Sequence, residues 1–296
     1  MKNKLITVFA VLIVVAGAVI LLYPVVSNIQ FRNSQLELAE YYENQVQELT
    51  EEEIDTMWDE CREYNQRLLD SKVQLTDPFD TKALDMEEHP YIDLLNRNGD
   101  GAMGSIEIPA ISCRLVVYHY TDTDVLAKGV GHLQGTSLPV GGQGTHSVLS
   151  GHTGTADKEL FTNLDRLSEG DVFYMHVLGK VLAYQIDSKS VVLPNETEGL
   201  YIDREKDLVT LVTCTPYGVN SHRLLVRGTR ISYDEAKKIE QSRGVVSGKT
   251  WERQYFYAVL AGAALAAVIV AVIVFVYRRR MSRKTNHTCS DTLEKE

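Results

Sequence analysis

The 296-residue sequence has little positive charge for its size. Its 30 Lys and Arg residues are outnumbered by 40 Asp and Glu residues, and the formal net charge at pH 7 is -10. Proteins that bind nucleic acid hold its phosphates with clustered Lys and Arg side chains. An acidic chain of this composition is therefore not expected to have a nucleic-acid partner.

Cysteine is also scarce. The four cysteines, Cys61, Cys113, Cys214 and Cys289, form no CxxC pair. No Cys/His cluster has the spacing of zinc ligands, so a metal site is not expected. Cys289 lies beyond a long apolar run at residues 255–277, which is predicted to cross the membrane, so it cannot pair with the other three cysteines. Those three make an odd number. This argues against a dense disulfide framework and leaves at least one thiol free for chemistry.

Two apolar runs, residues 5–23 and 255–277, are long enough to cross a membrane as helices, which takes about 20 residues. Lys2 and Lys4 precede the first run, and Arg and Lys residues crowd positions 278–284 after the second. Basic flanks stay on the cytoplasmic side, so both termini are predicted to be cytoplasmic and the middle of the chain extracellular. A cleaved signal peptide is the alternative for the first run, which is longer than the roughly 7–15 apolar residues usual for one.

Between the two runs, the pattern changes from helical to extended. Residues 31–75 are rich in Glu, Gln, Leu and Tyr and predict two or three amphipathic helices, one of which starts at a capping box of Thr50 and Glu53. Further on, short strand-like runs separated by turn signals indicate a closed barrel or a sandwich. The candidate strands are residues 104–108, 113–118, 146–150, 171–177, 180–186, 190–193, 208–213 and 222–230.

The last two candidate strands are joined by the turn sequence TPYGVNS, which is too short for a parallel crossover and predicts an antiparallel hairpin. Cys214 ends the first strand and Arg223 begins the second, so the two side chains should lie side by side. A guanidinium next to a thiol favours the thiolate, which is the reactive form of cysteine. A buried structural cysteine is the alternative interpretation.

A cysteine nucleophile needs a partner that accepts and donates protons, and histidine is the usual choice. Seven histidines lie on the predicted outer side: His89, His119, His132, His146, His152, His176 and His222. His152 has the best local context because it follows an apolar strand and stands between the small residues Gly151 and Gly154. His222 is next to Arg223 but would point to the opposite face of its strand. The residues alone leave this choice open.

Five segments together resemble the class C sortases, which assemble pili. They are MGSIEIP at 103–109, GHLQGTSLPVGG at 131–142, THSVLSGHTG at 145–154, LFTNLDRLSEG at 160–170, and the hairpin with TLVTC at 210–214. The last of these matches the TLxTC signature of sortases, and the resemblance covers roughly residues 92–230.

The resemblance implies a mainly β fold, a closed eight-stranded sortase barrel with N-terminal helices and two flanking transmembrane helices. It places His152, Cys214 and Arg223 together at one edge of the barrel. The chain departs from its relatives at Thr153, where they commonly have Arg after the histidine. This departure is expected to alter substrate contacts and to leave the triad whole.

The resemblance also implies a lid made of Asp77, Pro78 and Phe79. In such a lid the acid pairs with Arg223 and the aromatic ring shields the thiol from solvent. Without the family context, Asp-Pro-Phe would be read equally well as an ordinary turn between the helices and the barrel.

The implied activity is that of a cysteine transpeptidase without a metal or organic cofactor. Cys214 would cleave an LPxTG-type sorting signal between Thr and Gly, with His152 protonating the departing amine and Arg223 holding the substrate backbone or the oxyanion. A lysine amine of the next pilin subunit would then take the acyl group, which polymerises the pilus.

Two other functions stay open. One is a sortase that attaches surface proteins to peptidoglycan, and the other is a membrane-tethered binding barrel in which Cys214 is a core thiol. The second apolar run favours the pilus class, because housekeeping sortases usually have only the N-terminal one.

The sequence thus predicts a Gram-positive cell-membrane protein with an extracellular catalytic domain. The expected parts are a signal anchor at 1–27, a helical region with the lid at 28–95, the catalytic barrel at 96–232, a stalk at 233–254, a transmembrane helix at 255–277 and a cytoplasmic basic tail at 278–296.

Overall fold

The computed structural model describes residues 2–71, 73–80, 91–155 and 158–243, together with short pieces between 256 and 275. Contacts divide the chain into two compact units, one formed by Val26–Gly248 and the other by Met1–Val25 and Lys249–Glu296. The first of these units contains the whole barrel and all the residues of the predicted site.

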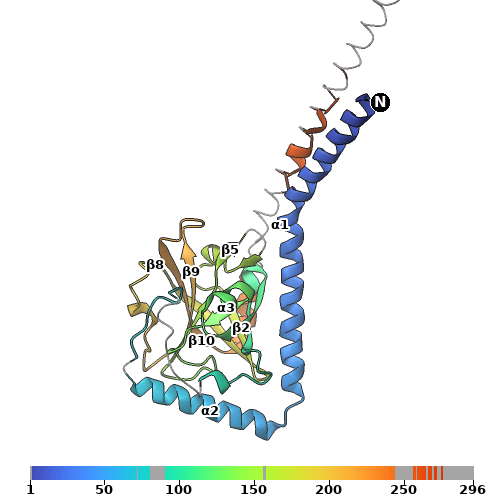
Figure 1. The fold of residues 1–296 in the computed structure, drawn as a ribbon. Coiled ribbons are helices and arrows are strands. Elements are labelled where there is room, and N and C mark those ends of the chain that lie inside the picture. Colours follow the sequence, from blue (N-terminus) through green and yellow to red (C-terminus); the bar gives the residue numbers. More distant parts are fainter. Residues whose placement is uncertain are drawn as a thin grey trace, which may run out of the picture. The chain divides into compact units, whose positions relative to one another are not determined.

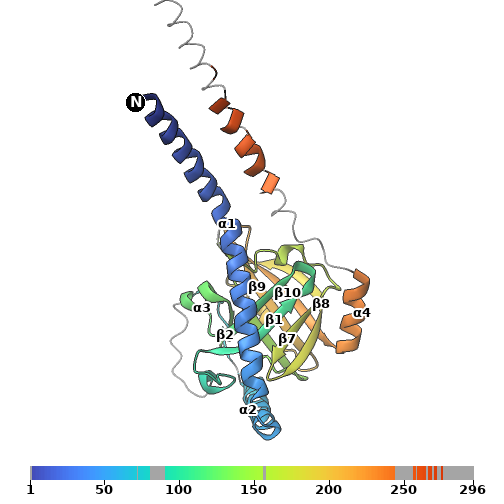
Figure 2. The same cartoon turned by 90° about the vertical axis from the view of Figure 1, so that its right-hand side faces the viewer.

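Two helices precede the barrel, as the pattern over residues 31–75 predicts. They are α1 (Lys2–Gln47) and α2 (Glu51–Asp70), and the capping box of Thr50 and Glu53 at the start of α2 is present. Beyond residue 26, α1 runs along one side of the barrel, and α2 crosses one end of it (Figures 1 and 2). The helical pattern over residues 31–75 thus corresponds to the C-terminal part of α1 and to α2.

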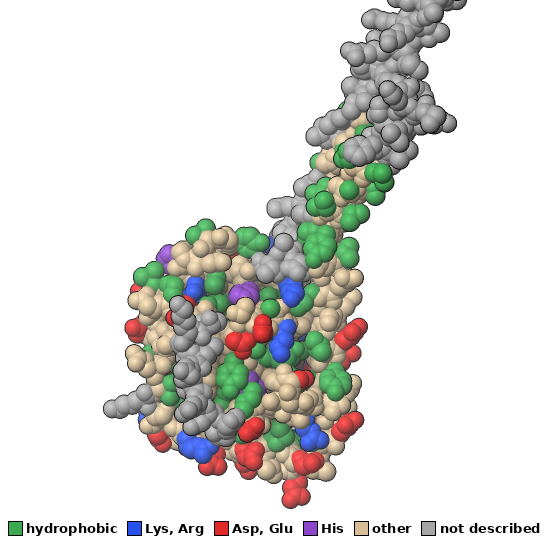
Figure 3. All heavy atoms as spheres, viewed as in Figure 1, with side chains coloured by type: hydrophobic (Ala, Val, Ile, Leu, Met, Phe, Trp, Pro, Cys, Tyr) green, Lys and Arg blue, Asp and Glu red, His purple; other side chains and the backbone are tan. Residues whose placement is uncertain are grey.

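The acidic first turn of α2 suits its position in the helix. Glu51, Glu52 and Glu53 follow the cap, where carboxylates interact favourably with the helix dipole. Figure 3 shows acidic side chains along the edge of the molecule that α2 occupies in Figure 1. The face of α2 that points toward the barrel buries Trp58, Cys61 and Asn65, and this face holds the helix to the barrel.

Eight strands close into a barrel in the order β1-β2-β3-β4-β9-β10-β8-β7. Their bounds are β1 (Ala102–Ile108), β2 (Cys113–His119), β3 (Val130–His132), β4 (Thr145–Ser150), β7 (Val172–Val177), β8 (Lys180–Val192), β9 (Asp207–Thr215) and β10 (His222–Ile231). The pairs β2–β3 and β4–β9 are parallel, and the other pairs are antiparallel. Of the two architectures that the residues left open, the chain adopts the barrel.

Smaller elements complete the unit. A separate two-stranded sheet is formed by β5 (Thr153–Thr155) and β6 (Lys158–Leu160), and α3 (Thr123–Lys128) leads into β3. The described residues also include short 3-10 turns at Tyr91–Asp93, Pro109–Ile111, Leu164–Arg166 and Glu198–Leu200.

The eight strands are not the eight candidates expected from the sequence. The candidates 180–186 and 190–193 fall on one strand, β8, which continues through the polar residues Asp187 to Ser190. Its pairing with β10 shifts register at Asp187, which has no partner in β10. The sequence does not predict β3, which has only three residues. Gly131 within β3 is required there, because a Cβ would collide with the carbonyl of Tyr120.

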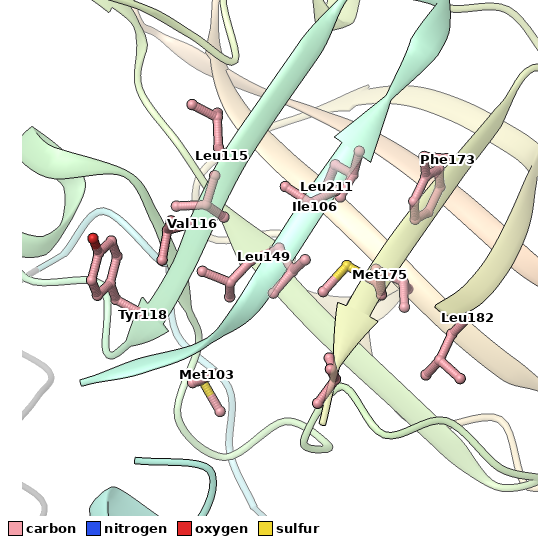
Figure 4. Packing of buried hydrophobic residues seen from close by; sticks show 14 of the residues in the cluster. Met103, Ile106, Leu115, Val116, Tyr118, Leu149, Phe173, Met175, Leu182 and Leu211 are labelled. Atoms are coloured by element: carbon pink, nitrogen blue, oxygen red, sulfur yellow. The ribbon is translucent and has the colours of Figure 1, made fainter. Parts of the chain in front are cut away.

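The barrel interior is filled with apolar side chains from its strands. Ile106, Leu149, Met175 and Leu211 are fully buried and lie near one another in Figure 4. Burial of one such side chain contributes roughly 1.5–3 kcal/mol. Because side chains fill this interior, a site that a substrate can reach must lie at the ends of the strands.

The polar segment after the barrel, expected to be a stalk over 233–254, begins with a helix. α4 (Tyr233–Arg243) packs against β7 and β8 and fully buries Ala236. The hydroxyl of Tyr174 also donates to Oε2 of Glu240 at 2.7 Å. The first half of this segment therefore belongs to the barrel unit, and residues 244–254 lie outside the described residues.

Among the described residues, the N-terminal helix from Val15 to Gln47 is the one segment long and apolar enough to cross a membrane, judged by length and composition. The second predicted span, 255–277, is described only in pieces, with a shorter apolar helical stretch at Val259–Val268. The basic tail at 278–296 and His89 lie outside the described residues.

Candidate active site

The register of two parallel strands brings a histidine and a cysteine to the same edge of the barrel. Ser150 at the end of β4 pairs with Val212 in β9. His152 follows Ser150 by two residues, and Cys214 follows Val212 by two residues. Because β4 and β9 run in the same direction, the imidazole and the thiol leave the barrel at one edge.

The hairpin of β9 and β10 adds an arginine to this edge. Arg223 pairs directly with Cys214, as the sequence predicts, and side chains of such a pair share one face of the sheet. Nη1 of Arg223 donates to the backbone oxygens of Asn220 at 3.1 Å and His222 at 3.0 Å. These bonds fix the guanidinium against the turn that joins the two strands.

The loop that carries His152 is packed against Phe161. A Cβ on Gly151 would approach the ring of Phe161 to 2.8 Å, so only glycine fits there without a shift. The backbone N–H of Phe161 donates to the His152 carbonyl at 3.1 Å. The small residue before His152, which suggested an open strand end, is therefore needed for packing.

The segment Asp77 to Phe79 covers this edge. Nε and Nη2 of Arg223 donate to the two carboxylate oxygens of Asp77 at 2.9 and 2.6 Å. The side chains of this pair are only 11% and 14% exposed, and Pro78 is buried. The expected contact between Asp77 and Arg223 is present.

Phe79 lies between the arginine and the histidine. Its ring centroid is 5.0 Å from the guanidinium carbon of Arg223 and 5.8 Å from the centroid of the His152 ring. The structure therefore brings together His152, Cys214, Arg223 and the Asp77–Phe79 segment, although Asp77 and Arg223 are 146 residues apart in the chain.

The charges around Cys214 do not favour a thiolate in this arrangement. Burial raises the pKa of the Cys214 thiol; Arg223 acts to lower this pKa, and the Asp77 carboxylate acts to raise it. The expectation of a stabilised thiolate is therefore wrong for the covered site. It failed because burial, together with the smaller effect of the Asp77 charge, outweighs the effect of the guanidinium on the thiol pKa.

The other two groups also respond to burial. Burial lowers the pKa of His152, which favours the neutral imidazole. Burial also acts to lower the pKa of Arg223, but the hydrogen bonds to Asp77 and the charges of Cys214 and Asp77 together outweigh it, and the pKa is raised. Near pH 7 the covered site thus holds a neutral thiol, a neutral imidazole and a paired guanidinium.

The other described histidines are engaged elsewhere. Burial lowers the pKa of His132 to about 3 and that of His146 to about 4, and both rings are hydrogen-bonded within the fold. His119 contacts two backbone carbonyls, His176 pairs with Glu107, and His222 contacts Ser221. Among the described histidines, the geometry thus favours His152, which lies at the same barrel edge as Cys214 and beside Phe79.

The sequence does not reveal the apolar bed beneath the covering segment. Phe79 and Val73 pack on a cluster of buried residues, namely Leu75, Leu133, Val148, Leu200, Val212 and Leu225. These residues come from separate segments, and each looks like an ordinary core residue in the sequence. Within the described part of the chain, no three His, Cys, Asp or Glu side chains are grouped to hold a metal ion.

Comparison with known proteins links this geometry to one family. Residues 106–231 match the family model described as Sortase domain. The chain is 41% identical to Streptococcus pneumoniae Sortase C, with a TM-score of 0.62, over 67% of this chain and 97% of that one. It is 45% identical to sortase C-1 from Actinomyces oris, with a TM-score of 0.56, over 60% of this chain and 99% of that one.

A curated relative is more distant. Sortase D of Bacillus subtilis (strain 168) is 31% identical over 134 residues, which are 44% of this chain and 65% of the relative. The match thus spans just under two thirds of that relative's length.

Proposed function

The chain belongs to the sortase family of cysteine transpeptidases, and we propose that it acts as a class C sortase that joins pilin subunits. The observation that carries this proposal is the meeting of His152, Cys214 and Arg223 at one barrel edge beneath Asp77–Phe79. Its similarity to the S. pneumoniae Sortase C, whose structure was related to pilin substrate specificity, supports the pilus class.

In the proposed reaction, the Cys214 sulfur attacks the carbonyl carbon of Thr in an LPxTG-type signal. His152, neutral at the outset, takes the thiol proton and gives it to the amine of Gly as the Thr–Gly bond breaks. The products of this half-reaction are a thioester on Cys214 and a released fragment with a free amine.

In the second half-reaction, a lysine amine of another pilin subunit attacks the thioester. An isopeptide bond forms, the bond to the Cys214 sulfur breaks, and the proton of the amine returns to the His152–Cys214 pair. Arg223 serves both halves: its planar, permanently charged donors hold the substrate backbone or the oxyanion. Neither half needs a metal or an organic cofactor.

Asp77, Pro78 and Phe79 act as a lid in this proposal. A substrate cannot use Arg223 while Asp77 holds two of its donors, and Phe79 occupies the space between Arg223 and His152. The lid must therefore move before the first half-reaction. The neutral thiol beneath it keeps the enzyme unreactive until then.

We place the enzyme in the cell membrane of a Gram-positive bacterium. The apolar N-terminal helix supports one anchor by its length and composition. The second apolar run and the basic residues around both runs support two spans, cytoplasmic termini and an extracellular barrel.

A fluorogenic LPxTG peptide tests the chemistry. We expect the Phe79→Ala protein, with its lid weakened, to cleave the peptide, and the Phe79→Ala/Cys214→Ala protein to have no activity. Cys61→Ala in the same Phe79→Ala background is the control, because it removes a free thiol on α2 that lies outside the site. If cleavage survives the loss of Cys214, or Phe79→Ala cleaves nothing, the enzyme proposal is wrong and the binding barrel is favoured.

Co-expression with LPxTG-bearing proteins separates the two kinds of sortase. A pilus-assembling enzyme produces a ladder of high-mass species that survives boiling in detergent, because isopeptide bonds are covalent. Single substrate molecules released only after digestion of peptidoglycan would instead support the anchoring function.

A further inference from the structure

The pairing of β4 with β9, which aligns His152 with Cys214, ends two residues before each of them. The last register pair of β4 and β9 is Ser150 with Val212. One backbone hydrogen bond continues past it, from the Gly151 N–H to the Val212 carbonyl at 3.1 Å. His152 and Cys214, the two proposed catalytic residues, therefore lie beyond the last pair of the β4–β9 ladder.

Two threonine hydroxyls take over where the ladder ends. The hydroxyl of Thr213 donates to the Gly151 carbonyl at 2.7 Å, and that of Thr153 donates to the Cys214 carbonyl. The residues flanking His152 are thus each tied to Cys214 or its neighbour. Conversely, Thr213 and Cys214 of β9 are both held to the loop that carries His152.

The hydroxyl protons of Thr153 and Thr213 are both used in hydrogen bonds to backbone carbonyls. Each threonine has one hydroxyl proton, and each hydroxyl faces one backbone carbonyl. The two Oγ1 atoms lie 3.0 Å apart, so each side chain also limits the movement of the other. Loss of either hydroxyl leaves a carbonyl without its donor and loosens its neighbour.

We propose that Thr153, acting with Thr213, is a positioning residue that sets the distance between the His152 ring and the Cys214 sulfur. This inference rests on the proposed function. Thr153 also stands where relatives commonly have Arg, and its contacts face inward to Cys214 and Thr213. Its role in this chain is thus to align His152 with Cys214.

The distance matters because proton transfer requires heavy atoms within about 2.6–3.2 Å of each other. A displacement of about 1 Å can lower a rate about a hundredfold. Substrate binding depends on other groups, chiefly Arg223 and the apolar bed. Loosening of the histidine loop should therefore affect kcat more than KM.

The test compares Thr153→Val with Thr153→Ser in the full-length Phe79→Ala protein, with the fluorogenic LPxTG peptide as substrate. Valine keeps the shape of threonine without the hydroxyl, and serine keeps the hydroxyl. We expect kcat of Thr153→Val to fall about 10- to 100-fold with little change in KM, and Thr153→Ser to retain most of kcat.

Thr145→Val in the same background is the matched control. Thr145 begins β4, at the opposite end from the site, and its hydroxyl donates to the Gly142 carbonyl at 2.6 Å. This variant loses a comparable bond, so we expect a comparable loss of thermal stability without a loss of kcat. An equal loss of kcat in Thr145→Val would overturn the proposal, because general destabilisation would then explain the effect.

Two other results would overturn it. One is an unchanged kcat in Thr153→Val, and the other is equal impairment of Thr153→Val and Thr153→Ser. If Phe79→Ala itself cleaves no peptide, the proposed function fails, and the pH profile of Cys214 alkylation by iodoacetamide still tests the positioning role.

We expect His152→Ala to remove the step in this alkylation profile that arises from histidine titration. Thr153→Val should diminish the same step and Thr153→Ser should keep it. A Thr153→Val profile identical to that of Phe79→Ala would overturn the role of Thr153 whatever the enzyme's substrate is.

Discussion

At the scale of single residues, burial, the Arg223 guanidinium and the Asp77 carboxylate together set the pKa of the Cys214 thiol. Arg223 alone would favour the thiolate, but Asp77 lies against the guanidinium and acts to raise the pKa of Cys214, in addition to the larger effect of burial. The proposed lid segment would therefore restrain the proposed nucleophile in two ways, by covering it and by its charge.

The substitution Asp77→Asn separates charge from cover. We expect it to lower the pKa of Cys214, because the opposing charge disappears and the asparagine is nearly the same size. Below its pKa the thiolate fraction rises about tenfold for each unit by which the pKa falls, so alkylation at pH 7 should be faster. The measurement is the rate of reaction with iodoacetamide between pH 6 and 10.

Asp80→Asn is the control for this prediction. Asp80 is exposed and lies in the same segment, but the carboxylate paired with Arg223 belongs to Asp77. An equal acceleration in both variants would mean that net charge or general loosening of the lid, and not the Asp77–Arg223 pair, controls the thiol.

The sequence predicted the neighbours of Cys214 better than it predicted the state of the thiol. Local turn chemistry is sufficient to pair Cys214 with Arg223, since both belong to one hairpin. The burial and the Asp77 charge that raise the pKa come from distant segments. Only the family resemblance pointed to Asp77, and no signal pointed to Thr153 as a hydrogen-bond donor.

At the scale of elements, α2 is held by the Asn65 side chain, which hydrogen-bonds both backbone groups of Leu138. The amide of Asn65 donates to the Leu138 carbonyl at 3.1 Å and accepts from the Leu138 N–H at 2.7 Å. Both residues are buried, so these bonds replace water that the groups have lost. The helix leading to the lid is thereby fixed to the barrel.

Asn65→Ala should cost about 2–4 kcal/mol of the free energy of unfolding, since two buried backbone groups lose their partners. Chemical denaturation of the barrel unit measures this loss. Gln66→Ala, a change at the exposed neighbouring position, should alter stability by less than about 0.5 kcal/mol. Equal effects of the two substitutions would show that the Asn65 bonds contribute little.

The sequence predicted strands correctly where the paired residues form a long apolar run. It failed where paired residues are polar or where the strand is very short. The hairpin of β9 and β10 has long apolar strands and a clear turn, and the sequence predicts it well. β8 was divided because its middle is polar, although β10 pairs with residues on both sides of Asp187, across a register shift. β3 was missed because three residues with a central glycine give no periodic signal.

At the scale of the whole molecule, the chain forms two units of different character. Val26–Gly248 has its own apolar core, while the other unit contains the apolar N-terminal residues and the C-terminal segment. The sequence predicts this separation from its two apolar runs. It does not predict that α4 belongs to the barrel unit, because a short polar segment resembles a linker.

We expect residues 26–248 alone to fold and to remain soluble without detergent. The reason is that Gln35 and Tyr42 on α1, and Ala236 on α4, make their contacts within this unit. The measurements are thermal unfolding and the rate of Cys214 alkylation, which should equal that of the full chain in detergent. A fragment of residues 50–248, which lacks the α1 contacts of Gln35 and Tyr42, should be less stable. If it is equally stable, or if residues 26–248 aggregate, the boundary between anchor and barrel unit lies elsewhere.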